Sequence, residues 1–226
     1  MSIQINVPDH ILFEDPYIIV LSKPGGLMVE PDRNGHPNLL QQLKKYFRSR
    51  ESKGYEIYAQ HLHRLDRPVS GIVLFAKQRT VLKNLSEQFA ERRVKKYYQA
   101  LTINEPERLN GKLEGWHKKE KKKAVLFDEN VPDAERVALD YRVTRFSEEF
   151  FQWDIELHTG KYHQIRAQLS AAGCPILGDE LYGSGVSYKP NSIALHAAKL
   201  IFSHPVSGLI VSVEDKQPFF LKRDRK

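Results

Sequence analysis

The sequence predicts an α+β protein built on a mixed, largely antiparallel β-sheet flanked by helices. Short apolar or alternating runs, typical of strands, are interspersed with amphipathic runs typical of helices. The two kinds of run do not alternate strictly, as they do in a doubly wound parallel sheet. No linker rich in Pro, Gly or Ser divides the chain, so we expect a single domain over residues 1–226.

The N-terminal part is expected to supply strands and two helices. Residues 11–23 read as two short strands around the turn at Asp15-Pro16, and the sequence KPGG then breaks the second strand. Apolar residues recur at helical spacing over 38–50, where Asn38 has the side chain of an N-cap. The other elements expected here are an extended run at 57–66, a buried strand at 71–76, a helix at 79–92 and a strand at 94–103.

The segment 105–130 is polar and contains a cluster of lysines. These are Lys118, Lys119, Lys121, Lys122 and Lys123. The cluster is either a solvated hairpin tip or a loop that faces RNA, and composition alone favours the first, because charge runs are usually solvated. The elements expected after it are paired strands at 138–145 and 151–158, a helix at 164–172 ended by Gly173, and strands at 193–203 and 209–213.

Composition and charge indicate what stabilises the protein, in which compartment it works and what kind of partner it binds. With 41% hydrophobic residues among 226, the chain can fill a core without disulfides or metals. The single Cys174 cannot form an internal disulfide, and no Cys/His cluster has zinc spacing, so a reduced cytoplasm is the expected compartment. The N-terminal residues do not have the pattern of a signal peptide. No run of roughly 18 apolar residues, the length that a membrane-spanning helix needs, occurs in the sequence. The formal charge of +7 favours a polyanionic partner, although this signal is weak alone.

Several familiar catalytic patterns are absent from the sequence. It contains no GxGxxG, GxxxxGK[ST], HExxH or GxSxG. Nucleotide-driven chemistry, zincin hydrolysis and α/β-hydrolase chemistry therefore have no local support.

The segment HRLDRPVSG, residues 63–71, is the most conspicuous candidate site. It places Asp66 at the end of an extended run, between Arg64 and Arg67 and before a turn that contains Pro and Gly. Neighbouring guanidinium groups favour the ionised carboxylate, which can act as a nucleophile or general base. The alternative is structural, because an Asp at such a turn often only bonds the turn backbone.

Two further segments carry candidate side chains. In 159–166, a strand end, a glycine and a helix start bring together basic residues that include Arg166, which can bind an anion or steady a carboxylate, or can simply be solvated. In the basic strand KKYY, Tyr97 or Tyr98 can stack on a base or supply a phenol, and either can equally belong to the core.

Taken together, these segments resemble the RluA family of pseudouridine synthases, over roughly residues 11–215. The matches occur in the family's order, and six separate motifs are very improbable as a coincidence. They are KPGGL at 23–27, HRLD with SG at 63–71, KKYY at 95–98, GKYHQIR at 160–166, PILGD at 175–179 with Tyr182, and LHA at 195–197.

The resemblance implies a pseudouridine synthase-like catalytic domain that isomerises specific uridines in ribosomal or transfer RNA without a cofactor or metal. The implied catalytic residues are Asp66, Tyr98 and Arg166. The implied substrate- or RNA-binding residues are Arg64, Ile165, His63, Lys23 and the lysine cluster 118–123. A monomeric cytoplasmic enzyme acting on structured RNA is expected, with neither DNA nor membrane as a partner.

Some features depart from the family pattern. Val69 stands where Thr is usual, and Tyr162 where Ser or Thr is common. Neither change touches the carboxylate. The chain is also expected to lack the N-terminal S4 RNA-binding module of many members, which raises the prospect that the lysine cluster binds RNA.

Two other functions compete with this interpretation. One is an RNA-binding protein without catalysis, against which the Asp66, Tyr98 and Arg166 set argues. The other is a nucleosidase or glycosidase, which needs a second acid near Asp66. Asp179 and Glu180 are the motif-linked candidates for that acid.

Overall fold

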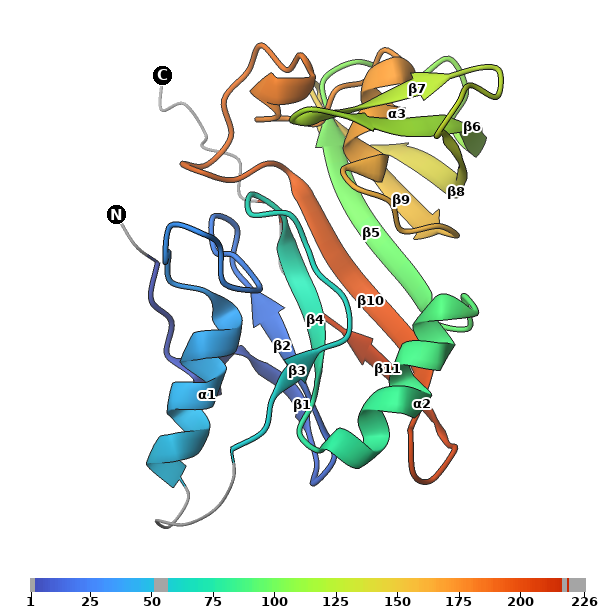
Figure 1. Ribbon diagram of the computed structural model, residues 1–226. Coiled ribbons are helices and arrows are strands. Elements are labelled where there is room, and N and C mark those ends of the chain that lie inside the picture. The colour runs from blue at the N-terminus through green and yellow to red at the C-terminus, as the bar shows by residue number, and fades with distance from the viewer. Residues whose placement is uncertain (1–2, 51–56, 217–218, 220–226) are drawn as a thin grey trace. The chain divides into compact units, whose positions relative to one another are not determined.

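The structure, a computed structural model, describes residues 3–50, 57–216 and 219 (Figure 1). The chain forms two compact units. The first contains residues 1–96 and 199–215, and the second contains 97–198 and 216–226. Strands β5 (Lys95–Thr102) and β10 (Leu195–Ser203) run from one unit into the other. The single-domain organisation over 1–226 stays a prediction.

The first unit is built on antiparallel strands with two α-helices. Strand β2 lies between β1 and β4, β3 pairs with the end of β4, and β11 pairs with the 199–203 part of β10. The bounds of its elements are η1 Val7–His10, β1 Ile11–Glu14, β2 Ile18–Lys23, α1 Leu39–Arg50, β3 Gln60–His61, β4 Ser70–Ala76, α2 Arg79–Ala90 and β11 Ile210–Glu214.

Local chemistry explains where these elements start. The Oδ1 atom of Asp15 accepts hydrogen bonds from the backbone N–H groups of Tyr17 and Ile18, at 2.7 and 2.8 Å, which makes the turn between β1 and β2. The Oδ1 atom of Asn38 accepts the N–H of Gln41 at 3.0 Å, so the predicted N-cap of α1 is confirmed. Both helices bury an apolar face, and the core of the unit joins α2 to β2 and β4.

The second unit is an antiparallel sheet with a short helix against it. Its strands pair in the order β5, β9, β8, β6, β7. Helix α3 packs against β6 and β7. The bounds of the elements not yet given are β6 Asn110–Glu120, β7 Lys123–Phe127, β8 Glu135–Arg145, β9 Phe151–Leu157, α3 Gln164–Ala171 and η2 Glu180–Tyr182.

The predicted fold class and most predicted elements are confirmed. The main difference is the segment 105–130, in which the sequence analysis places no strand and leaves open a hairpin tip or a loop, and which forms β6 and β7. Much of β6 is exposed and polar, so it lacks an alternating apolar pattern, but β8 and β7 pair with its two edges. Pairing rather than side-chain hydrophobicity therefore makes it a strand. Within the extended run 57–66, Gln60–His61 form strand β3, and the N–H of Leu62 donates to the carbonyl of Leu74 on β4 at 3.0 Å.

Within the described ranges, no helix is long and apolar enough to cross a membrane.

Candidate active site

In the first unit, two of the sequence motifs are bonded to each other. Strand β2 ends at Lys23 opposite Gly71 of β4, so the loops that flank these strands lie together. The N–H of Gly26 donates to the carbonyl of Arg67 at 2.7 Å, and the Nε of Arg67 donates back to the carbonyl of Gly26 at 3.1 Å. The turn that holds Asp66 is therefore braced by the preceding motif. Asp66 itself is half-buried, and its carbonyl accepts the N–H of Val69 at 3.0 Å.

Lys23 is fully buried behind this turn. Its Nζ donates to the carbonyls of Pro24, Leu27 and Arg67, at 3.0, 2.7 and 3.3 Å. Burial lowers the pKa of Lys23 to about 7, and the negative charge of Asp66 opposes part of that shift. The ammonium thus uses its donors on the chain's own backbone. This geometry does not support the expected contact between Lys23 and RNA.

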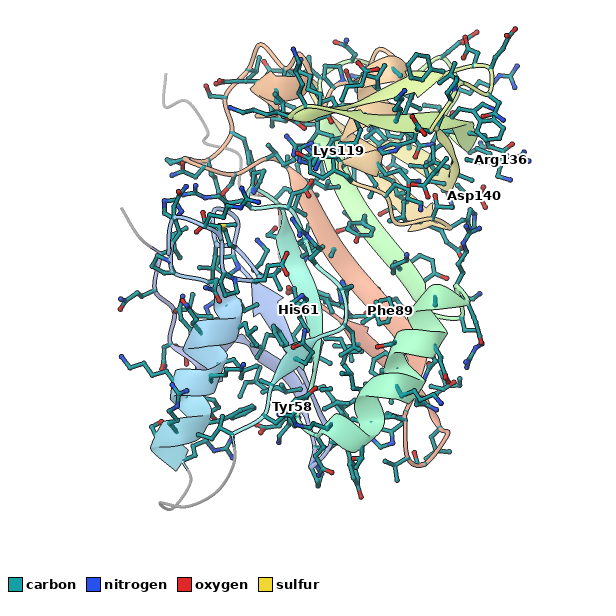
Figure 2. The ribbon with its side chains drawn as sticks, in the orientation of Figure 1. Tyr58, His61, Phe89, Lys119, Arg136 and Asp140 are labelled. Carbon is teal, nitrogen blue, oxygen red and sulfur yellow. The ribbon has the colours of Figure 1, made fainter. Side chains whose placement is uncertain are left out.

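His63 is also used inside the unit. Its Nε2 accepts the backbone N–H of Leu74 at 3.2 Å, and its ring stacks on Phe89 with centroids 5.1 Å apart. Phe89 projects from α2 in Figure 2. Burial lowers the pKa of His63 to about 3, with a further contribution from the positive charge of Lys96. His63 is therefore a neutral imidazole that links the 63–71 segment to β4 and α2.

This burial makes the stability of the protein sensitive to acid. Between pH 6.5 and about 3 the unfolded chain protonates this imidazole and the folded chain does not, so the folded state loses stability as the pH falls below 6.5. We expect His63→Gln, whose amide oxygen can still accept the Leu74 N–H, to show a shallower loss of melting temperature between pH 6.5 and about 5. Melting curves across that range measure both slopes, and equal slopes would contradict the assignment.

Arg64 reaches away from the turn to an acidic partner. Its guanidinium pairs with the carboxylate of Glu30, whose other oxygen lies 3.2 Å from the Nε2 of His61. His61 lies on β3 in Figure 2. The Arg64 side chain is 63% exposed, so this pair leaves the guanidinium accessible to an RNA phosphate or base.

In the second unit, Arg166 forms a buried bidentate ion pair. Its Nε and Nη2 donate to the Oδ2 and Oδ1 of Asp179 at 2.7 and 2.8 Å, and both side chains are almost completely buried. The guanidinium also lies over the ring of Tyr182, 5.0 Å from its centroid. Asp179 belongs to the loop before η2, so the two motifs of this unit fix the orientation of Arg166 together.

The remaining predicted residues of this unit lie on regular elements. Ile165 is buried next to Arg166 at the start of α3, and Tyr98 is buried on β5, where it pairs with Ile155 of β9. The roles that the resemblance implies for Ile165 and Tyr98 stay predictions.

The lysine cluster forms the tip of the hairpin between β6 and β7. Lys119, Lys121, Lys122 and Lys123 are exposed, whereas Lys118 is half-buried. The Nζ of Lys118 donates to the carbonyl of Pro132 at 2.9 Å and lies 3.9 Å from the carboxylate of Asp133. Of the two alternatives left open by the sequence, the structure shows a hairpin tip, and its four exposed ammonium groups are accessible to anions.

Sequence reasoning missed the structural partners of the predicted residues. Asp179 was considered as an acid, whereas it is the buried partner of Arg166. Glu30 carried no motif signal, and its pairing with Arg64 depends on the path of a loop. The interlocking of 23–27 with 63–71 could have been suspected, since both motifs flank strands that end together. Within the described residues, no group of three or more His, Cys, Asp or Glu side chains is placed to hold a metal ion.

The chain is similar in sequence and in fold to several known proteins. The RNA pseudouridylate synthase family matches residues 17–171. The chain is 31% identical to an uncharacterized RNA pseudouridine synthase, YhcT, of Bacillus subtilis, over 94% of this chain and 70% of that protein. It is 32% identical to the dual-specificity RNA pseudouridine synthase RluA of Salmonella typhi, over 88% of each. The fold resembles human RNA pseudouridylate synthase domain containing 4, with a TM-score of 0.76, 22% identity and coverage of 94% and 90%.

Proposed function

Since the chain belongs to the family of RNA pseudouridine synthases, which are isomerases, we propose that it isomerises specific uridines of a structured RNA with Asp66 as the catalytic carboxylate. The observation that carries this proposal is the bracing of the Asp66 turn. Lys23, Gly26 and Arg67 fix the backbone around a half-buried carboxylate next to positive charge. A carboxylate held in this way is suited to act as a nucleophile or base.

The reaction rearranges one glycosidic bond and needs no net redox change. The bond between uracil N1 and ribose C1′ breaks, the base rotates, and a bond between C5 and C1′ forms. The hydrogen on C5 is lost to solvent and N1 gains a proton. Asp66 acts by attack on C1′, which displaces the uracil anion, or by taking the C2′ proton as the C1′–N1 bond breaks, which leaves the sugar as a glycal and releases the uracil anion. In the second route the proton returns to C2′ when C5 bonds to C1′, and both routes use the ionised form of Asp66.

The other residues are assigned roles around the target nucleotide. Tyr98 stacks on the uracil or takes part in proton transfer. Ile165 forms an apolar wall beneath the base, and Arg166 supplies the positive charge of the site. Arg64 contacts the phosphate of the flipped nucleotide or fills the gap it leaves, because extruding a base costs a few kcal/mol that protein contacts must offset. Lys23 and His63 position the Asp66 segment instead of contacting RNA.

A second acid for hydrolysis has little support. Both carboxylate oxygens of Asp179 accept hydrogen bonds from Arg166, and the side chain is 1% exposed. A carboxylate whose two oxygens both accept hydrogen bonds from a buried guanidinium, and which is closed off from solvent, is not free to contact a substrate. The other candidate acid, Glu180, lies exposed on η2. We therefore favour the isomerase over the nucleosidase, with ribosomal or transfer RNA as the substrate and a cytoplasmic monomer as the working form.

RNA with tritium at uridine C5 tests the proposal. An isomerase releases the tritium to water, because C5 loses its hydrogen when it bonds to C1′, and the base stays in the chain. A nucleosidase instead releases free uracil that keeps its tritium. Large-subunit ribosomal RNA and transfer RNA made without modification are the substrates to use. Binding of both RNAs without release of tritium from either would indicate a protein that only binds.

We expect the hairpin lysines to set the salt dependence of RNA binding. Changing Lys121, Lys122 and Lys123 to Ser should weaken binding and flatten the plot of log K against log[salt] by about 0.7–0.9 for each phosphate that is no longer neutralised. Filter-binding titrations over a range of salt concentrations measure this slope. Lys83→Ser on α2 is a matched control, because its side chain is 88% exposed and pairs only weakly with Glu87. An unchanged slope in the triple variant would show that these lysines are solvated and do not neutralise RNA phosphates.

A further inference from the structure

Tyr162 connects the tip of the lysine hairpin to the start of α3. The Nζ of Lys119 lies 4.5 Å from the centroid of the Tyr162 ring, and the hydroxyl of Tyr162 donates to the carbonyl of Lys122 at 3.2 Å. The Nε2 of the buried His117 lies 2.7 Å from the carbonyl of Tyr162. Because side chains alternate along a strand, His117 and Lys119 share the face of β6 that meets Tyr162. Lys119 lies near the end of β6 in Figure 2.

The same tyrosine is fixed on its other side by the residue that precedes α3. The rings of Tyr162 and His163 stack with centroids 3.8 Å apart and an interplanar angle of 17°. His163 has a φ of 53°, in the left-handed region that non-glycine residues seldom adopt, so packing must hold it there. Its Nδ1 lies 3.1 Å from the hydroxyl of Tyr182, which accepts the N–H of Ala124 on β7 at 2.7 Å. Both strands of the hairpin are thus tied to the start of α3.

We propose that Tyr162 is a positioning residue that locks the basic hairpin tip onto α3, so that the lysines hold RNA in a fixed register with Ile165 and Arg166. The proposal rests on the proposed function and goes beyond it, because it assigns an RNA-positioning role to Tyr162, a residue at which this chain departs from the Ser or Thr common in the family pattern. A Ser or Thr side chain is too short to reach the Lys122 carbonyl or to stack on His163.

The physical reason for such a lock is the cost of ordering the tip on binding. A hairpin end with exposed, mutually repelling lysines loses conformational freedom when it docks on RNA, and a tip that is already fixed loses less. Tyr162 therefore acts on RNA affinity through the lysines. It does not act on the bond-making step, since its hydroxyl and ring are engaged by Lys122, Lys119 and His163.

Steady-state kinetics on unmodified large-subunit ribosomal RNA and transfer RNA test the lock. We expect Tyr162→Ser to raise KM about two- to tenfold, the effect of freeing a few side chains at a binding surface, with kcat within about twofold of wild type. Tyr162→Phe keeps the stacking on His163 and the cation contact with Lys119 and removes the hydroxyl that bonds Lys122, so it should stay nearer to wild type than Tyr162→Ser. Thermal unfolding confirms that each variant is folded. If the Ser variant is not, Tyr162→Leu retains apolar packing near Ala124 and Tyr182 and carries the same expectation.

A double-mutant cycle then separates the lock from a general loss of structure. Changing Lys121, Lys122 and Lys123 to Ser should cost less RNA affinity in the Tyr162→Ser background than in wild type, because the two changes remove the same interaction. Additive effects, an unchanged KM, or a fall in kcat without a change in KM would overturn the proposal. Tritium release by the wild-type enzyme tests the proposed function separately, and RNA affinity can be measured whether or not tritium is released.

Discussion

Asp66→Asn is expected to reduce pseudouridine formation by at least about a thousandfold, the scale seen when a nucleophile or general base is removed. Asn has the same shape as Asp but carries no charge, so it can neither attack C1′ nor accept a proton. The turn should remain folded, because it is braced by hydrogen bonds that the substitution does not remove: Gly26 N–H to the Arg67 carbonyl, Arg67 Nε to the Gly26 carbonyl, and Val69 N–H to the Asp66 carbonyl. Release of C5 tritium under single-turnover conditions measures the effect without interference from product release.

RNA binding provides the control for this variant. The Asp66 carboxylate is one negative charge beside a basic site, so its loss should leave the affinity for RNA unchanged or slightly higher. Asp154→Asn is a matched change of an exposed carboxylate on β9, where the oxygen accepts hydrogen bonds from Gln99 and Gln152. It should keep full activity. An Asp66→Asn enzyme with more than about a tenth of wild-type activity would show that the carboxylate is not catalytic.

Asp179→Ala is expected to destabilise the protein by about 3–5 kcal/mol, because it leaves the buried guanidinium of Arg166 without its counter-charge. The side chains of Asp179 and Arg166 are 1% and 6% exposed, so water cannot easily replace the missing carboxylate. Arg166 should also lose its fixed orientation, and activity should fall with stability. Urea unfolding monitored by circular dichroism gives the free energy of unfolding, and a variant as stable as wild type would contradict the pairing.

A double variant distinguishes the structural role of this pair from its catalytic role. In Arg166→Met with Asp179→Leu, both charges are replaced by apolar groups of similar size, a change that is often neutral or stabilising for buried pairs. We expect stability to return to within about 1 kcal/mol of wild type, while activity stays low because the cationic partner is gone. Recovery of activity along with stability would show that Arg166 serves only the fold.

Sequence patterns predicted the fold well where side chains report directly on local structure. The Asp15 turn and the Asn38 cap were predicted because each depends on one side chain bonding nearby backbone groups. Strands β6 and β7 were not predicted. Their polar residues face solvent, and their pairing with β8 and with each other depends on contacts distant in sequence.

In the candidate site, too, local sequence predicted some features, and others depend on contacts distant in sequence. The motifs that carry Asp66, Tyr98 and Arg166 were identified from the residues and the resemblance. What the sequence could not supply is which side chain uses its charge inside the protein. Lys23 looks like any basic residue beside a glycine turn, yet it is fully buried on three carbonyls. Asp179 looks like a candidate acid, yet both of its oxygens accept hydrogen bonds from Arg166. Whether a charged side chain is available to a substrate or is used inside the protein depends on its partner in the folded structure.

Pseudouridine mapping of total RNA, by carbodiimide modification and primer extension, tests the central claim most directly. RNA is compared from cells that carry the gene, cells that lack it, and deleted cells that express either wild-type protein or Asp66→Asn. The proposed function predicts at least one uridine of ribosomal or transfer RNA that loses its modification in the deletion and regains it with wild type only. Restoration of that position by Asp66→Asn as well would contradict the assignment of Asp66 as the catalytic carboxylate.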